Sequence, residues 1–221
     1  MFRVGLTGGI GSGKTTVSRI FQTFGFAVYN ADREAKRFLL SEEVMRLFAP
    51  PAAPDSSVAS AMSGTSAVSV KFAKSAASIT PITPKEIAAI VFSDVEKLRA
   101  LNAIIHPLVM DDFEQWAASQ ASSQRQTVSQ TAPFVLMESA IIYESNLQHH
   151  FDKIIFVDAP EELRIKRVMK RSNLSREEVL QRISMQISSQ EALRRADFVI
   201  KNDESTSLLK QVQMFCLLHF K

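Results

Sequence analysis

Cysteine is almost absent from this chain of 221 residues, which carries Cys216 alone. A single cysteine excludes an intramolecular disulfide and favours a reducing compartment. Long apolar runs are also missing, because no stretch approaches the roughly eighteen apolar residues that a membrane-spanning helix needs. A glycine-rich loop lies so close to the first residue that no leader segment is expected. We therefore expect a cytoplasmic protein without a membrane partner.

A large net charge is lacking too. The formal charge is +3 at pH 7, which is small for a protein that binds nucleic acid. Five basic residues are clustered between residues 164 and 171. Such a cluster favours a compact anionic ligand over a long polyanion, and no nucleic-acid partner is expected.

What the sequence does hold is a glycine-rich loop that follows an apolar run and precedes a helical pattern. Gly8, four further residues, Gly13, Lys14 and Thr15 form the spacing of a phosphate-binding loop. Glycines let backbone N–H groups turn toward a bound anion. We expect Lys14 to contact the β and γ phosphates and Thr15 to ligate Mg²⁺. The residues expected to bind ATP here are Gly9, Gly11, Ser12, Gly13, Lys14, Thr15 and Thr16.

Five short apolar segments are predicted to be strands, at residues 2–7, 26–30, 133–138, 153–158 and 197–201. Helical segments separate them, which favours parallel pairing through right-handed crossovers. We therefore expect an α/β fold of the P-loop type with a five-stranded parallel sheet flanked by helices.

The predicted core comprises residues 1–40 and 133–221, including a helical lid at about 160–188. Residues 41–132 are expected to form an inserted, mostly helical subdomain that binds the acceptor. Within it, segment 49–82 is rich in Ala, Ser and Pro and shows no sustained period, so it resembles a flexible insertion.

Helix signals return at residue 83. Thr83 and Glu86 form a capping box, and a second cap lies at 93–94. The helix that begins there is expected to end before Pro107, because proline disfavours the α conformation in the preceding residue. A separate helix carrying Phe113 and Trp116 is expected to follow.

Two carboxylates follow predicted strands. Asp32 comes just after the strand at 26–30, where parallel sheets bind ligands, but it is equally suited to cap the next helix. Glu138 ends the strand at 133–138, where it would hold a Mg²⁺-bound water or would be a plain loop carboxylate. The spacing leaves both alternatives open for each residue.

The basic cluster lies on a predicted helix that begins near Pro160. Arg167 and Arg171 are four residues apart and share one side, as two groups that clamp one polyphosphate must. A basic surface helix is the alternative, but the upstream phosphate loop favours the clamp. Ser175 and Glu178 form a third capping box, which begins a helix expected to close over the nucleotide.

A phosphate loop indicates a nucleotide and not a reaction. The Asn-Lys-x-Asp motif by which GTPases recognise guanine is absent, and so is the Ser-Gly-Gly signature of ABC-type ATPases. What remains is a small kinase with an acceptor-side carboxylate, a helical cap and an arginine-rich lid.

At this point the chain resembles the dephospho-CoA kinase family, over about four-fifths of its length. The matching residues are Gly5 to Lys14, Ala31-Asp32, Ile90-Val91-Phe92, Leu101-Asn102, His106-Pro107, Glu138-Ser139-Ala140, Tyr143-Glu144, Arg167, Arg171, Gln186, Arg195 to Ile200 and Asn202. The family's arginine is missing near residue 80, and Ser172 replaces an aspartate that is common after the second lid arginine.

The resemblance implies a sheet with a helical CoA domain and a lid, and transfer of the ATP γ-phosphate to the ribose 3′-hydroxyl of dephospho-CoA. It implies ATP and dephospho-CoA as substrates, with Mg²⁺. The residues that it implies are Asp32, Lys14, Arg167 and Arg171 for catalysis, Asn202 for ATP, and Asp32 with His106 for the acceptor.

Two other functions stay open from the sequence. One is a different small-molecule kinase, for a nucleoside monophosphate or a sugar acid. The other is an ATP-binding protein whose acceptor site is impaired, because segment 49–82 looks unlike the family.

Overall fold

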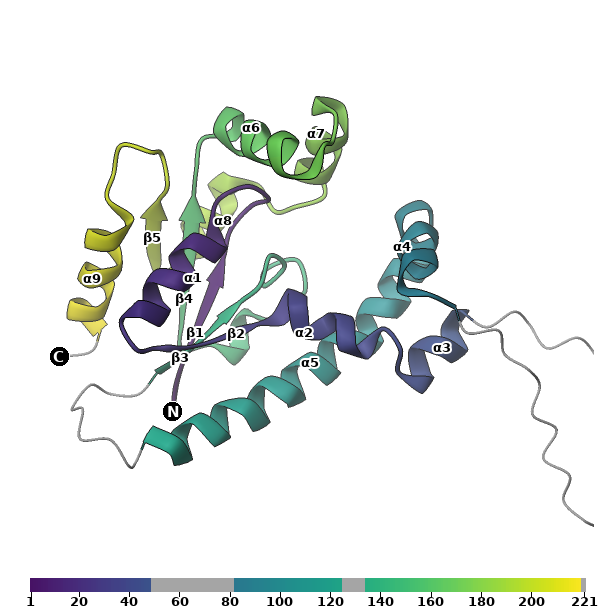
Figure 1. Ribbon diagram of the computed structural model, residues 1–221, viewed down its shortest axis with the longest axis horizontal. Helices are drawn as coiled ribbons and strands as arrows, with labels where there is room; N and C mark the ends of the chain where they lie inside the picture. The colour runs from purple at the N-terminus through teal and green to yellow at the C-terminus, as the bar shows by residue number, and fades with distance from the viewer. Residues whose placement is uncertain (49–81, 125–133, 220–221) are drawn as a thin grey trace, which may run out of the picture.

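The computed structural model describes residues 1–48, 82–124 and 134–219. Its centre is a sheet of five parallel strands in the order β2-β3-β1-β4-β5, shown in Figure 1. The strands are β1 (Phe2–Thr7), β2 (Ala27–Asn30), β3 (Phe134–Glu138), β4 (Lys153–Asp158) and β5 (Phe198–Lys201). The expected fold class is confirmed, and each strand lies within one residue of its predicted bounds.

One face of the sheet is covered by α1 (Lys14–Thr23) and α9 (Leu208–His219). Phe21 of α1 is fully buried and packs edge-on against Phe134 of β3 and Phe215 of α9, with ring centroids 6.0 and 5.8 Å apart. Leu6 and Val157 lie in the same cluster. The last helix therefore packs on the sheet.

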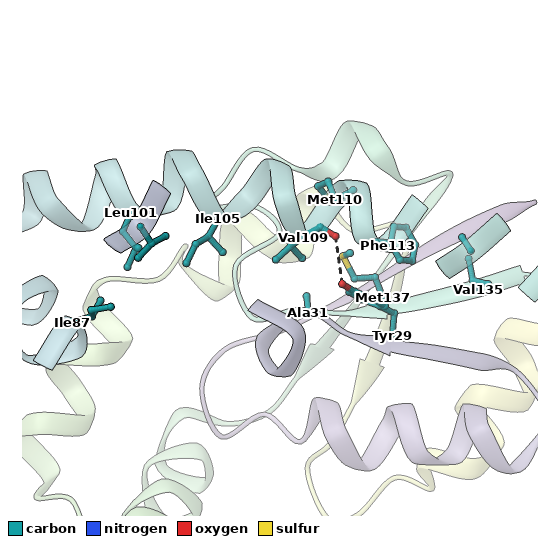
Figure 2. Packing of buried hydrophobic residues seen from close by; sticks show 12 residues of the cluster. Tyr29, Ala31, Ile87, Leu101, Ile105, Val109, Met110, Phe113, Val135 and Met137 are labelled. Carbon is teal, nitrogen blue, oxygen red and sulfur yellow. Dashed lines mark hydrogen bonds between the residues drawn. The ribbon is translucent and has the colours of Figure 1, made fainter. Parts of the chain in front are cut away.

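The opposite face is covered by α2 (Ala31–Phe38), α5 (Val95–Gln124) and α8 (Ser189–Arg195). Figure 2 shows Val109, Met110 and Phe113 of α5 beside Tyr29 and Met137 of the sheet. The Tyr29 hydroxyl donates a hydrogen bond of 2.6 Å to Asp112 of α5. This carboxylate and the burial of the ring raise the pKa of Tyr29, so the phenol stays a neutral donor that joins helix to sheet.

The predicted break at Pro107 is wrong, because α5 continues through that residue. Proline inside a helix costs about 3 kcal/mol. Leu101 and Ile105 before Pro107, and Val109 and Phe113 after it, are all buried on the same core. Burial of each such side chain contributes roughly 1.5–3 kcal/mol, so continuous packing outweighs the local preference.

The helix starts predicted at residues 83, 93–94 and 175 are confirmed. A capping box of Thr83 and Glu86 begins α4 (Pro84–Ser93), and the Asp94 side chain accepts a bond of 3.0 Å from Lys97 N at the start of α5. A second capping box, of Ser175 and Glu178, begins α7 (Arg176–Ser184). It follows α6 (Glu161–Ser172).

Figure 1 places α6 and α7 beyond the carboxyl end of β4. The helices α3 (Glu42–Phe48) and α4 pack on α5 away from the sheet. The Ala/Ser/Pro-rich segment predicted at 49–82 lies, apart from its last residue, outside the described residues. Among the described helices, none is long and apolar enough to cross a membrane.

Candidate active site

The loop between β1 and α1 holds glycines in backbone conformations that other residues rarely adopt. Gly11 and Gly13 have φ angles of 77° and 93°, in the left-handed region. The space above Gly13 is taken by the side chain of Asn202, whose Nδ2 donates to Ser12 O at 2.7 Å. A Cβ at Gly13 would overlap this amide. The loop shape is therefore fixed by glycine and by a residue from the far end of the chain.

Lys14 is the first residue of α1 and turns back toward its own loop. Its Nζ donates to Gly8 O at 2.7 Å and to Gly9 O at 3.3 Å. Burial lowers the pKa of this ammonium, while the nearby Asp32 and Glu138 carboxylates oppose that effect. The ammonium is thus held in place before any phosphate binds.

Glu138 is the buried last residue of β3, so the loop alternative for this carboxylate is wrong. Its two oxygens accept hydrogen bonds from Thr15 Oγ1 at 2.7 Å and Ser18 Oγ at 2.8 Å, both on α1. Asn30 Nδ2 of β2 donates a third bond of 3.2 Å. Three elements thus converge on one carboxylate beside the hydroxyl that was expected to ligate Mg²⁺.

Asp32 lies in the first turn of α2, and it is not the helix cap. The side chain of Asn30 caps α2 instead, by accepting a bond of 2.8 Å from Arg33 N. Although solvent reaches the Asp32 side chain, the protein around it raises the pKa of the carboxyl, and Lys14 partly opposes the rise. Asp32 is therefore free to face the phosphate loop.

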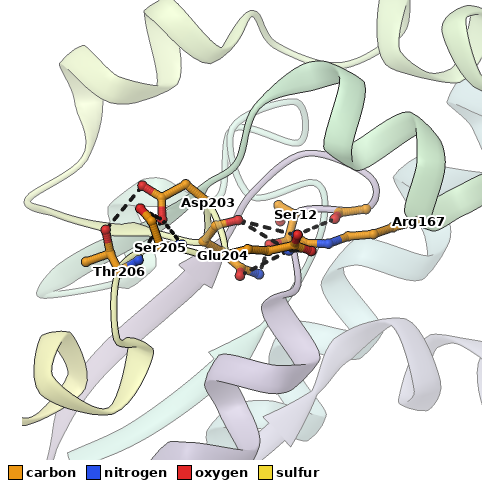
Figure 3. A network of polar contacts seen from close by, with 8 residues as sticks. Ser12, Arg167, Asp203, Glu204, Ser205 and Thr206 are labelled. Carbon is orange, nitrogen blue, oxygen red and sulfur yellow. Dashed lines mark hydrogen bonds and ion pairs between the residues drawn. The ribbon is translucent and has the colours of Figure 1, made fainter.

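Arg167 and Arg171 of α6 are on the side of the helix that faces the polar groups of the loop. Arg167 donates to Gly11 O at 3.5 Å and to Asn202 O at 3.4 Å, and pairs with Glu204 at 3.2 Å. Figure 3 shows Arg167 between the loop and the turn that follows β5. Arg171, one turn further along α6, lines a polar cavity that residues of the loop also line. The predicted sharing of one side by the two arginines is what brings both to the loop.

That turn is itself held by Asp203. Its carboxylate accepts bonds from Ser205 N at 3.0 Å and Thr206 N at 2.9 Å, which lower its pKa to about 2. Figure 3 shows these contacts beside Glu204. Asp203 remains ionised near neutral pH, and it supports the turn that carries Asn202.

A polar cavity of about 440 Å³ opens between the loop, β3 and α6. Its lining residues are Ile10, Gly11, Gly13, Lys14, Thr15, Thr16, Asp32, Glu138, Ala140, Arg167, Val168, Arg171 and Gln186. Three of the residues expected to bind ATP do not line this cavity, namely Gly9, Ser12 and Asn202. Ser12 is fully buried, and Gly9 packs against the Arg164 guanidinium.

Arg164 and Gln186 were not assigned a place from the sequence. Arg164 is 6% exposed and fills the space that a Cβ on Gly9 would need. Gln186 follows α7, and its Oε1 accepts a bond of 2.7 Å from Ile10 N. Both residues contact the loop although they lie more than 150 positions after it in the sequence. No local spacing in the sequence indicates such contacts.

A second cavity, of about 210 Å³, lies on the other side of Asp32. It is lined by Ala31, Asp32, Ala35, Lys36, Leu39, Leu101, Asn102, Ile105, His106, Val109, Met137, Ser139, Ile141 and Leu147. Most of these side chains are apolar and come from α2, α5 and the turn after β3. Within the described part of the chain, Asp32 alone lines both this cavity and the polar one.

His106 lies at the rim of the apolar cavity, on the side of α5 that faces the turn after β3. Its Nε2 and the Ser145 hydroxyl are 3.3 Å apart and share a hydrogen bond. Burial lowers the pKa of the imidazole, so the ring is neutral at pH 7. The sequence placed this residue at a helix end, whereas it lies in the middle of α5.

The described residues contain no group of three or more His, Cys, Asp or Glu side chains that would hold a metal by themselves. The candidate ligands for Mg²⁺ are therefore the Thr15 hydroxyl and, through water, Glu138. A cation held by so few protein groups takes its other ligands from substrate phosphates and water. This donor set fits a Mg²⁺ ion that arrives with its nucleotide.

Comparison with known proteins agrees with this geometry. The family model described as dephospho-CoA kinase matches residues 2–47 and 82–207. It passes over residues 48–81, which include most of the segment that looks unlike the family in the sequence.

The dephospho-CoA kinase of Bacteroides fragilis is 34% identical over 210 residues, which are 95% of this chain and 89% of that protein. A crystal structure from Thermus thermophilus matches with a TM-score of 0.72 at 31% identity, over 98% of this chain and 96% of that one. The dephospho-CoA kinase from Campylobacter jejuni matches with a TM-score of 0.58 at 25% identity, over 98% and 95%.

Proposed function

This chain belongs to the dephospho-CoA kinase family, and from that premise we propose how its residues transfer the γ-phosphate of ATP to the 3′-hydroxyl of dephospho-CoA. The observation that carries the proposal is the position of Asp32 between the two cavities. A phosphoryl transfer needs the attacking and leaving oxygens roughly in line at the transferred phosphorus, and Asp32 stands at the boundary where the two substrates would meet.

The polar cavity takes the triphosphate of ATP. Backbone N–H groups of the loop, the N-terminus of α1 and Lys14 supply positive charge for the phosphate oxygens. Lys14 exchanges Gly8 O and Gly9 O for oxygens of the β and γ phosphates. Thr15 and Glu138 are the residues that would hold a Mg²⁺ ion, which would supply positive charge against the charge that develops on the phosphates.

Asp32 orients the acceptor hydroxyl and accepts its proton. The carboxyl is close enough to Lys14 for the two charges to affect each other's pKa. A raised pKa makes the carboxylate a stronger base than a free aspartate. The proton leaves the 3′-oxygen as the bond to phosphorus forms, and ADP is the leaving group.

Arg167 and Arg171 stabilise the transferring phosphoryl group from the α6 side. They line the polar cavity opposite Asp32 and Glu138, so positive charge faces the γ-phosphate from both the loop and the helix. Charge of this kind acts most strongly where water is excluded. The α6–α7 pair is the element suited to exclude it, as a lid.

The apolar cavity takes the part of dephospho-CoA next to the reacting ribose. Leu101, Ile105 and Val109 of α5 offer a flat apolar wall, which suits a purine base. His106 and Asn102 at the rim supply polar partners. Lys36 lies at the same cavity and is suited to the acceptor's diphosphate.

The test is release of ADP from Mg²⁺-ATP, measured by enzymatic coupling with dephospho-CoA, with adenosine monophosphate or with no acceptor. We expect release with dephospho-CoA alone, together with formation of coenzyme A. Release with adenosine monophosphate would identify another small-molecule kinase. ATP binding without acceptor-dependent release would identify a binding protein with an impaired acceptor site.

A further inference from the structure

Two consecutive residues after α7 contact the two substrate regions separately. Gln186 accepts a bond of 2.7 Å from Ile10 N in the phosphate loop. The next residue, Ile187, donates its N–H to Glu144 Oε1 at 2.9 Å. Glu144 belongs to the turn after β3, so one dipeptide joins the phosphate loop to that turn.

The turn that carries Glu144 is a wall of the acceptor cavity. Ile141 and Leu147, on either side of Glu144, line that cavity. Between them Ile142 is fully buried and Leu147 N donates to Ile142 O at 2.9 Å. The turn therefore moves as one unit, because a buried side chain and an internal bond hold its shape.

The same turn also reaches His106. Ser145, the neighbour of Glu144, shares a hydrogen bond of 3.3 Å with His106 Nε2. A continuous series of contacts thus runs from Ile10 through Gln186, Ile187 and the Glu144 turn to His106. One end is at the ATP phosphates and the other is at the acceptor.

We propose that Glu144 is a positioning residue that couples the two sites, so that binding of the nucleotide tightens binding of the acceptor. This inference rests on the proposed function, because it assumes that dephospho-CoA occupies the apolar cavity. The bound nucleotide orders the phosphate loop, and the loop orders Gln186 and Ile187 through the bond from Ile10 to Gln186. The bond from Ile187 to Glu144 then orders the turn that lines the acceptor cavity. By linkage the acceptor tightens nucleotide binding by the same factor.

Glu144 itself lines neither cavity, so its removal takes away no contact with a substrate. Its side chain is exposed, and its carboxylate also acts on Lys14 through charge. A hydrogen-bonding role and a charge role are separable, because glutamine keeps the carbonyl oxygen that accepts from Ile187 N and loses only the charge.

The experiment measures the dissociation constant of dephospho-CoA by calorimetry, with and without a non-hydrolysable ATP analogue and Mg²⁺. The proteins are the wild type, Glu144→Ala, Glu144→Gln, Gln186→Ala and the double alanine variant. Glu191→Ala serves as a matched surface control, because Glu191 forms ion pairs on α8 outside both cavities. Thermal unfolding of each protein confirms that it is folded.

We expect the analogue to tighten dephospho-CoA binding about tenfold in the wild type, within the usual range of coupling between sites. Glu144→Ala should reduce the tightening to less than twofold while dephospho-CoA alone binds as in the wild type. Glu144→Gln and Glu191→Ala should keep the tightening. The double variant should lose no more coupling than Glu144→Ala, because both residues act in one series of contacts.

The inference would be overturned if the ATP analogue tightened dephospho-CoA binding in Glu144→Ala as much as in the wild type. It would also be overturned if the analogue caused no tightening in the wild type. Equal losses in Glu144→Gln and Glu144→Ala would also overturn it, since charge would then be the cause. Failure of the wild type to bind or phosphorylate dephospho-CoA would instead overturn the proposed function, and that result appears in the unmodified enzyme before any variant is compared.

Discussion

The two cavities that meet at Asp32 are lined by different kinds of chemical group. The nucleotide cavity is made of backbone groups, hydroxyls and charges fixed by hydrogen bonds, such as those from Thr15 and Ser18 to Glu138. The second cavity is lined mostly by apolar side chains from α2, α5, β3 and the turn after β3. Under the proposed function, directional polar groups contact the phosphates, whereas the apolar wall contacts the acceptor.

The boundary between the cavities is where a substitution has the largest effect. Asp32→Asn should lower kcat by about 10²–10⁴-fold, the usual contribution of general acid–base catalysis. The KM for ATP should stay within about threefold, because asparagine keeps the shape of the side chain. Steady-state kinetics at saturating dephospho-CoA provide the measurement. Turnover near that of the wild type in a folded protein would remove Asp32 from its proposed role.

The nucleotide side is tested at Gly13, where conformation and contact coincide. Gly13→Ala should weaken ATP binding by at least about tenfold, because the left-handed φ of 93° costs roughly 1–2 kcal/mol and the new Cβ displaces Asn202. Gly25→Ala is the matched control, since Gly25 has φ of 85° and open space around its Cα. It should lose stability without losing ATP affinity in calorimetry. Equal ATP affinities for the two variants would contradict the role of the Asn202 contact.

The acceptor side is tested by filling its cavity. Ala35→Leu on α2 should raise the KM for dephospho-CoA about tenfold, a loss of about 1.4 kcal/mol, with the KM for ATP unchanged. Ala103→Leu, on the exposed side of α5, is the control and should leave both KM values alone. A rise in the KM for ATP in Ala35→Leu would mean that the two cavities do not hold separate substrates.

The smallest expected effect is on stability, which Asp32→Asn should increase although it lowers kcat. The pKa of Asp32 is raised in the folded protein, so between the unfolded and folded values the native state binds more protons and stability falls as pH rises. Asp32→Asn should therefore have a slightly higher Tm than the wild type at pH 7. The difference should vanish below about pH 4, where the unfolded carboxyl is protonated too. A lower Tm at pH 7 would show that Asp32 stabilises the fold.

The contrast between the cavities also explains what the sequence reveals. Gly8, Gly13, Lys14 and Thr15 lie within eight positions, and their geometry is local, so spacing alone predicts the phosphate loop. Strand bounds are equally local, because each strand is a short apolar run between turns. Arg167 and Arg171 are placed by helical periodicity once the loop is known.

The remaining features depend on contacts over long distances along the chain. The cap of α2 lies at Asn30 and not at Asp32 because three elements meet there around Glu138. The break expected at Pro107 is overridden by burial along all of α5. No periodicity of the sequence reports the apolar cavity, since its wall joins residues from Ala31 to Leu147.

The continuity of α5 has a mechanical consequence. Its 30 residues span about 45 Å at 1.5 Å per residue, and join the sheet at Phe113 to the acceptor wall at Leu101 in one rod. Pro107 leaves one carbonyl of that rod without its helical partner, and helices bend at such points. That point lies beside His106, between the turns of α5 that pack on the sheet near Phe113 and the turns that carry Leu101 and Ile105 of the apolar cavity.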